Sequence, residues 1–394
     1  MKDFVSEIIV PERLPQSSEP SAEIQPVQEP QAVQETQERI LWADLLRVVS
    51  ALMVIGLHYG RSIAIIPAAD CPSMSAWFTT NFCDCFFLPA VSLFVMLSGY
   101  LLLGKKDLLN WKQARRIGNI VRVLLVWSAV YLLALYFTAG ADRSAHTITV
   151  IEGIRTILAG NVDSHLWFLH LILGLYIAAP ILHTFVRNAD KKTLRYFVVL
   201  WCCASFVLKF LNTAARHLLG IDVLSPHFDF CVLSGFAGLF VIGYYLGYKP
   251  RLQMSKWGGA AVWVTIITLC LLAFTITLTA DYFHTSRRTL YYYVSPVFTL
   301  GSFVVIQYIG VMRIYRKSFL CTIVTKISPL TLGVYLIHML VLHLLGSGVI
   351  GIRLTVHSFH PLLSLPVGIL TIFVVSAAAV YVIGKIPLVS RIVL

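Results

Sequence analysis

The chain has 394 residues, of which 58% are hydrophobic and only 13% are charged, and its formal net charge is +12. An ordinary soluble domain has about a quarter of its residues charged, so this composition excludes a soluble globular fold. The basic residues fall between apolar runs rather than on one amphipathic face. The positive charge therefore indicates membrane topology, and we expect no nucleic-acid partner.

Residues 1–38 differ from everything that follows. They are rich in Gln, Glu, Pro and Ser, carry eight acidic and two basic side chains, and lack an apolar period. This composition predicts disorder. A signal-peptide pattern is absent, so we expect the segment to be retained. The predicted organisation is a disordered acidic cytoplasmic tail over residues 1–38 and a membrane domain over residues 39–394.

Apolar runs long enough to cross a bilayer, roughly 17 to 25 residues each, recur along the membrane domain. They predict an all-α fold, a polytopic membrane helix bundle with about ten transmembrane helices. The expected spans are 41–66, 76–103, 117–138, 165–187, 193–211, 229–248, 258–280, 291–311, 330–350 and 361–383.

The distribution of Lys and Arg over the predicted loops orients these spans. If the N-terminus is inside, the cytoplasmic loops and C-terminus hold eighteen basic residues and the opposite side holds eight. The positive-inside rule then predicts an even number of spans with both termini in the cytoplasm. The predicted spans include no matched pair of short, Gly- or Pro-broken helices, so nothing indicates an internal repeat of the transporter kind.

The first predicted span carries three ionisable residues in one stripe: Asp44, Arg47 and His58. Arg47 and His58 are eleven residues apart, so they share a helix face and lie roughly 16 Å apart along the axis. Such groups are costly in lipid, which predicts that they face a protein interior or a wet cavity. The alternative is structural: an ion pair of Asp44 with Arg47 at the headgroup level, and a His58 that satisfies a backbone carbonyl.

Five fragments together resemble the acyltransferase-three family of integral membrane O-acyltransferases, in particular its surface polysaccharide O-acetyltransferase branch. The resemblance covers about residues 39–385 and agrees with the ten-span topology. The fragments are Asp44-x-x-Arg47-x10-His58, Phe94-Val95-Met96-Leu97-Ser98-Gly99-Tyr100, His165-Leu166-Trp167-Phe168, Ile242-Gly243-Tyr244-Tyr245-Leu246-Gly247 and Leu332-Gly333-Val334-Tyr335-Leu336-Ile337-His338.

The resemblance implies a catalytic role for His58 and a donor-binding Arg-x-x-Arg at the start of the third span. This chain departs from that pattern, because Asn119 follows Arg116 at the second position. The second cation is absent, or is supplied by Arg122 or by Lys112. The alternative for Arg116 and its neighbour Arg115 is plain positive-inside anchoring.

Four further residues are candidates for substrate binding. Tyr335 and His338 lie one turn apart on the ninth span, where His338 is either a second acid/base group or a hydrogen-bonded core histidine. His165 and Trp167 lie at the outer mouth of the fourth span, where Trp167 occupies an aromatic-belt position. The eight cysteines have no zinc-ligand spacing, and we expect no metal site.

Acyl transfer from a thioester to an alcohol needs a base near the hydroxyl, stabilisation of the developing oxyanion and an anchor for the donor. Asp44, Arg47 and His58 are the catalytic candidates, with His58 as the base. The Arg residues are candidates for holding the phosphates of acyl-CoA.

The resulting expectation is an enzyme of the bacterial inner membrane that moves an acyl group, expected to be acetyl, from acyl-CoA to a hydroxyl of a surface polysaccharide or its lipid-linked precursor. Acetyl-CoA is a donor substrate in this prediction, no cofactor is bound permanently, and membrane lipid surrounds the protein. Two alternatives stay open. One is a transporter or flippase for a lipid-linked sugar that uses the buried groups as a relay. The other is a non-catalytic scaffold.

The charge distribution predicts that residues 1–38 lie on the same side of the membrane as the loop between the second and third spans. Single cysteines placed at Ser17 and at Asn110 should react with an impermeant thiol reagent in vesicles of the same orientation. Reactivity in opposite orientations would show that the number of preceding spans is wrong.

Overall fold

In the computed structural model, contacts between Cα atoms divide the chain after Arg39, and the compact unit is Ile40–Leu394. The structure describes residues 40–66, 71, 73–138, 150–160, 162–208, 211–212, 215, 220–221, 235–248, 259–260, 262–268, 287–349 and 351–393. The predicted tail, residues 1–38, lies outside the described residues.

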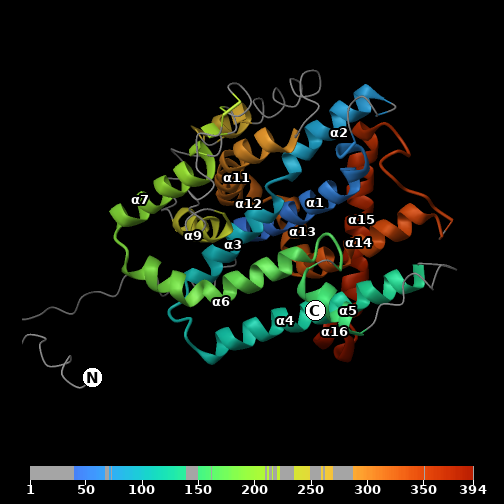
Figure 1. Ribbon diagram of the computed structural model, residues 1–394, viewed down its shortest axis with the longest axis horizontal. Coiled ribbons are helices and arrows are strands. Elements are labelled where there is room, and N and C mark those ends of the chain that lie inside the picture. The colour runs from blue at the N-terminus through green and yellow to red at the C-terminus, as the bar shows by residue number, and fades with distance from the viewer. Residues whose placement is uncertain are drawn as a thin grey trace, which may run out of the picture. The chain divides into compact units, whose positions relative to one another are not determined.

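The described part of the chain is helical and contains no β-strand, which confirms the predicted all-α class (Figure 1). Its helices are α1 Leu41–Ala64, α2 Met74–Phe87, α3 Ala90–Leu103, α4 Trp111–Thr138, α5 Val150–Leu158, α6 Trp167–Asn188, α7 Lys191–Cys202, the π-helical turn η5 Cys203–Val207, α9 Phe236–Gly247, α11 Arg287–Val311, α12 Arg313–Arg316, α13 Phe319–Ile327, the 3₁₀ turn η6 Ser328–Leu330, α14 Thr331–Ser347, α15 Pro361–Gly384 and α16 Pro387–Val393.

Six helical stretches among the described residues are long and apolar enough to cross a membrane. They are Leu41–Ala64, Met74–Leu103, Trp111–Tyr136, Trp167–Asn188, Phe319–Ser347 and Pro361–Gly384. Two shorter apolar helices, Phe236–Gly247 and Val297–Val311, fall in the predicted sixth and eighth spans. The chain is thus a polytopic membrane protein. The count of ten stays a prediction, because the fifth and seventh expected spans are only partly described.

Two of the predicted continuous spans are broken by proline. The second is divided at Leu88 and Pro89 into α2 and α3, and the ninth begins as α13, which passes through η6 with Pro329 before α14 starts. Proline has no backbone N–H and its ring crowds the preceding turn, so regular helix hydrogen bonding stops at both places. The ninth span is therefore longer at its start than the predicted range.

Helix α1 lies inside the bundle, where it packs against α2, α3, α11, α13, α14 and α15 (Figure 1). Its neighbours bury residues along most of its length, from Ala43 near the start to Ile63 near the end. Gly56 and Gly310 permit close packing: a Cβ on Gly56 would lie 2.6 Å from the ring of Phe87, and one on Gly310 would lie 2.3 Å from Cβ of Trp42. Of the charged stripe of α1, this packing buries Asp44 and leaves Arg47 and His58 half-buried.

Helices α3 and α9 cross at backbone contact. A Cβ added to Gly99 would lie 1.8 Å from the carbonyl oxygen of Phe240, and one added to Gly243 would lie 2.0 Å from the carbonyl oxygen of Met96. Small residues allow this approach between membrane helices, where packing replaces the hydrophobic driving force. Both glycines belong to fragments that carry the family resemblance, so these fragments have a structural role at this crossing.

We expect Gly99→Ala to destabilise the protein by about 1–3 kcal/mol, because the new methyl group overlaps a backbone oxygen that cannot rotate away. The matched control is Gly174→Ala in α6, where no atom lies within 4 Å of an added Cβ. Thermal unfolding in detergent should show a lower midpoint for the first variant and an equal or higher midpoint for the second, since alanine favours helix. Equal midpoints for Gly99→Ala and wild type would rule out the close crossing.

Candidate active site

The charged stripe of α1 has two separate parts. At its first turn the Asp44 carboxylate is buried and accepts hydrogen bonds from Arg47 Nη1 at 3.0 Å and from Ser328 Oγ at 2.6 Å. Its partners come from α1 itself and from η6, so this pair joins the start of α1 to the break between α13 and α14. His58 lies about 16 Å beyond Arg47 along the same helix axis. The structure therefore does not bring Asp44 or Arg47 to the imidazole.

Three histidines from three segments meet at the other part of the stripe. The ring centroid of His58 lies 5.4 Å from that of His338 and 6.3 Å from that of His165, and the last two are 5.1 Å apart. We call His58, His165 and His338 the histidine cluster. His165 and His338 are fully buried, with 1% and 0% of their surface exposed, whereas His58 is half-buried. A reactant that approaches the cluster would therefore meet His58 first.

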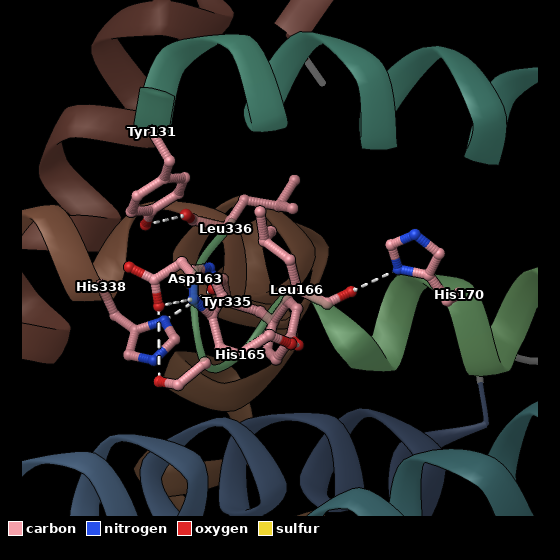
Figure 2. Close-up of polar contacts among 9 residues, drawn as sticks. Tyr131, Asp163, His165, Leu166, His170, Tyr335, Leu336 and His338 are labelled. Carbon is pink, nitrogen blue, oxygen red and sulfur yellow. Dashed lines mark hydrogen bonds and ion pairs between the residues drawn. The ribbon is translucent and has the colours of Figure 1, made fainter. Parts of the chain in front are cut away.

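Two tyrosines and a carboxylate hold the cluster in place (Figure 2). The Tyr335 hydroxyl donates to the carbonyl oxygen of His165, which ties α14 to the turn before α6. The Tyr131 hydroxyl donates to the carbonyl oxygen of Leu336 at 2.8 Å, and its ring lies 4.9 Å from that of His165. Asp163 Oδ1 lies 2.9 Å from Nδ1 of His165. These contacts fix the imidazoles on elements that are remote in sequence.

Asp163 lies in the turn that precedes α6 and is ionised at neutral pH. Burial raises the pKa of its carboxyl, but the hydrogen bond from His165 and the electrostatic interaction with that residue lower the pKa by more, so the net shift is downward. His338 is held differently, because its Nδ1 lies 2.6 Å from the carbonyl oxygen of Tyr335. Within the described residues, no group of three or more His, Cys, Asp or Glu side chains could hold a metal ion.

A second cluster, of cations, surrounds the first turns of α4. Burial lowers the pKa of Lys105, in the loop before α4, and the charges of Arg116 and Lys112 lower it further. Arg116 donates from Nη1 to Oε1 of Gln113 at 3.1 Å. Arg116 and Arg47 both interact electrostatically with Tyr176 of α6. We call Arg47, Lys105, Lys112 and Arg116 the cationic cluster.

Gln113 connects this cluster to α6. The side chain is buried and its Nε2 donates to the carbonyl oxygen of Tyr176 at 2.8 Å. On the same helix, Nε2 of His183 lies 2.8 Å from the carbonyl oxygen of Lys105, so it donates there. Helix α6 starts at Trp167, just after His165, and carries Tyr176, which interacts with Arg47 and Arg116. It therefore runs from the histidine cluster towards the cationic cluster, in the opposite direction to α1.

The remaining predicted site residues lie outside both clusters. Arg115 is exposed, and Arg122 is half-buried further along α4. Trp167 is 42% exposed and its ring packs against Phe236 of α9. A surface pocket of about 280 Å³ lies where η6 and the start of α14 meet the end of α15, next to Lys385 and Tyr381. None of its lining residues belongs to the histidine cluster.

Sequence reasoning missed several residues that complete the two clusters. Asp163 is the most important, and its only signal was the short spacing Asp-x-His with the candidate His165. Tyr131 and Ser328 carried no signal, because a single polar group in an apolar helix has no spacing partner. Lys105 was read as a topology signal only.

Comparison with known families decides between the classes that this geometry allows. The family model described as an acyltransferase domain, of the acyltransferase-three type, matches residues 40–383. The chain belongs to the acyltransferase-three family. The match spans every described element from α1 to α15 and includes both clusters. Searches of curated proteins and of solved structures returned no match.

The chain is thus a membrane acyltransferase, and its two clusters are suited to the two halves of an acyl transfer. The imidazoles of the histidine cluster carry ring nitrogens that can accept and donate protons. The cationic cluster can hold an anionic group at a fixed distance from them. Helix α1 sets that distance because it carries both Arg47 and His58. Helix α6 supports it, because it follows the turn that holds His165 and accepts a hydrogen bond from Gln113 of α4.

Proposed function

We propose that this acyltransferase transfers an acyl group, acetyl, from acyl-CoA to a hydroxyl of a cell-surface polysaccharide or its lipid-linked precursor. The observation that carries the proposal is the histidine cluster, which sits in an acyltransferase-three domain at the far end of a helix whose first turns belong to the cationic cluster. A polyanionic donor with an extended arm between its phosphates and its thioester matches this separation.

The donor half of the proposal rests on charge. Lys105 lies near the like charges of Arg116 and Lys112, and both disfavour the charge on its ammonium group. A phosphate group would relieve that repulsion and accept charge-assisted hydrogen bonds from Arg116. Lys105 would then replace the cation that Asn119 leaves absent from the Arg-x-x-Arg pattern. Arg47 would contribute from α1, although its charge is partly engaged by Asp44.

The acceptor half rests on burial and proton chemistry. His58 is half-buried, so it can contact both a reactant and the two buried imidazoles behind it. We assign His58 the central acid/base role of the transfer. A hydroxyl acceptor fits this chemistry, because it must lose a proton when it attacks the thioester.

The proposed location is the bacterial inner membrane with both termini in the cytoplasm. The cationic cluster would then face the cytoplasm, where acyl-CoA is made, and the histidine cluster would lie towards the opposite side. An acyl group could pass from a cytoplasmic donor to an acceptor on the far side without either substrate crossing the bilayer. The transporter alternative gains no support from the family or from the described helices, and we do not propose it.

Replacing His58 by Ala should abolish transfer without loss of the inserted protein, since removal of an acid/base group costs on the order of 10²- to 10⁴-fold in rate. The matched control is His360→Ala. The His360 side chain accepts from the Leu362 N–H and caps α15, so its loss should lower the unfolding midpoint and leave the activity per folded molecule intact. The assay is ester formation from acetyl-CoA and a hydroxylated glycan. A folded His58→Ala protein with wild-type rate would overturn the assignment.

Arg116→Ala should raise the Michaelis constant for acetyl-CoA about tenfold or more and change that for the acceptor little, because the proposed lost contact with phosphate contributes about 1.5–3 kcal/mol. The control is Arg195→Ala, an exposed arginine of α7 outside both clusters. It should leave both constants unchanged. Equal effects of Arg116→Ala on both substrates would return Arg116 to a role in topology.

A further inference from the structure

His165 is held through both its side chain and its backbone. Its side chain has no exposed surface, its Nδ1 lies 2.9 Å from Asp163 Oδ1, and its backbone carbonyl accepts the hydroxyl of Tyr335. Asp163 and His165 both belong to the short turn before α6, whereas Tyr335 comes from α14 (Figure 2). The ring therefore has one defined orientation next to His58.

The partners of His165 and His338 define which ring nitrogen carries the proton. A carboxylate and a carbonyl oxygen can only accept, so Nδ1 donates in both residues, to Asp163 in one and to the Tyr335 carbonyl in the other. In the neutral imidazoles Nε2 is then an acceptor. Among the described residues, neither Nε2 has a hydrogen-bond partner, and both are buried. A buried acceptor left without a donor costs about 1–3 kcal/mol.

These two acceptors lie beside His58, so the site is built to receive a donor such as a hydroxyl group. The two histidines are not equivalent as bases. When Nε2 takes up a proton, the carboxylate of Asp163 stabilises the resulting charge on His165, whereas a carbonyl oxygen offers His338 only a dipole. An imidazole with a carboxylate on its far nitrogen is the arrangement that orients and strengthens a general base.

We propose that the Asp163–His165 pair, rather than His58 alone, takes the proton of the attacking hydroxyl, and that His58 passes this proton to the leaving group. This inference rests on the proposed function. The acceptor O–H bond breaks and its proton goes to Nε2 of His165, while the oxygen forms a bond to the acyl carbon. The C–S bond breaks and its electron pair leaves on sulfur. The proton then moves through His58 to the thiolate, which yields the ester and free coenzyme A.

Asp163 acts through His165 and is therefore a positioning residue. His338 and the ring of Tyr131 complete the wall around the reacting atoms, with centroids 5.1 and 4.9 Å from that of His165. The role of His58 is still essential in this scheme, because it is the half-buried member of the cluster and the one that can meet the sulfur. His165 is then needed only for acceptors that must lose a proton during attack, whereas His58 is needed for every acceptor.

The test compares two acceptors that need a base to different extents, with purified protein in detergent and acetyl-CoA as the donor. Water must lose a proton during attack, whereas hydroxylamine is a neutral nucleophile that attacks thioesters without prior loss of one. Release of coenzyme A is followed with a thiol reagent, with the uncatalysed rate subtracted. His165→Ala should slow hydrolysis on the order of 10²- to 10⁴-fold and slow the hydroxylamine reaction less than tenfold. His58→Ala should slow both reactions strongly.

Two variants separate positioning from folding. Asp163→Asn keeps a hydrogen-bond partner but removes the charge, so it should lower the ratio of hydrolysis to hydroxylamine reaction in the same direction as His165→Ala, by a smaller factor. The control is His170→Ala, five residues after His165. The ring nitrogens of His170 lie near the carbonyl oxygens of Leu166 and Ile157. This variant should leave the ratio unchanged even if the protein is less stable.

The possible outcomes are distinct. If wild type releases no coenzyme A with either acceptor, and forms no ester with a glycan, the proposed function fails. If wild type is active and His58-dependent, but His165→Ala slows both reactions equally or neither, this inference is overturned while the proposed function stands. Protection of each variant against thermal unfolding by coenzyme A shows that the donor still binds, because a ligand that binds only the folded protein raises the midpoint.

Discussion

A charged side chain at the centre of a transmembrane helix costs about 2.5–3.5 kcal/mol or more when it faces lipid. Helix α1 carries Asp44, Arg47 and His58, so its stripe has to be enclosed by other helices. Six helices and the turn η6 pack around it. The turn η6 provides Ser328 for the carboxylate at one end, and α14 and the turn before α6 provide two imidazoles for His58 at the other. The position of α1 inside the bundle is therefore a consequence of its sequence, and both clusters are built from what surrounds it.

Much of this arrangement is readable from the sequence because it follows from two periodicities. Apolar runs of bilayer length predict the helices, and the eleven-residue interval from Arg47 to His58 predicts a shared face. Six helices of spanning length occur among the described residues, and Arg47 and His58 both lie in α1. The glycine fragments around Gly99 and Gly243 were predicted only as parts of a resemblance. Their physical basis, the backbone contact between α3 and α9, requires two helices far apart in the chain and is visible only in three dimensions.

The rest of the candidate site was not predictable, because it too depends on contacts between residues far apart in the chain. His165 is placed by a turn, not by a helix, so no helical period relates it to His58. Its contact with Tyr335 joins residues 170 positions apart. The polar partner Asp163 lies outside the apolar runs, where carboxylates are ordinary, and nothing in its own surroundings marks it as part of the site. Breaks at Pro89 and Pro329 also shift the neighbouring helix ends away from the predicted ranges.

The two clusters are joined by helices rather than by loops, and this has a chemical consequence. An acyl group bound through a distant anionic anchor reaches the imidazoles only if the separation of the clusters is constant, since a misplacement of about 1 Å can cost on the order of 100-fold in rate. Helix α1 and the antiparallel α6 both keep that separation constant. Gln113 links α6 to the start of α4, where Arg116 lies. The division between a fixed anchor and a buried proton-transfer site therefore follows from the helix packing that encloses the charges of α1.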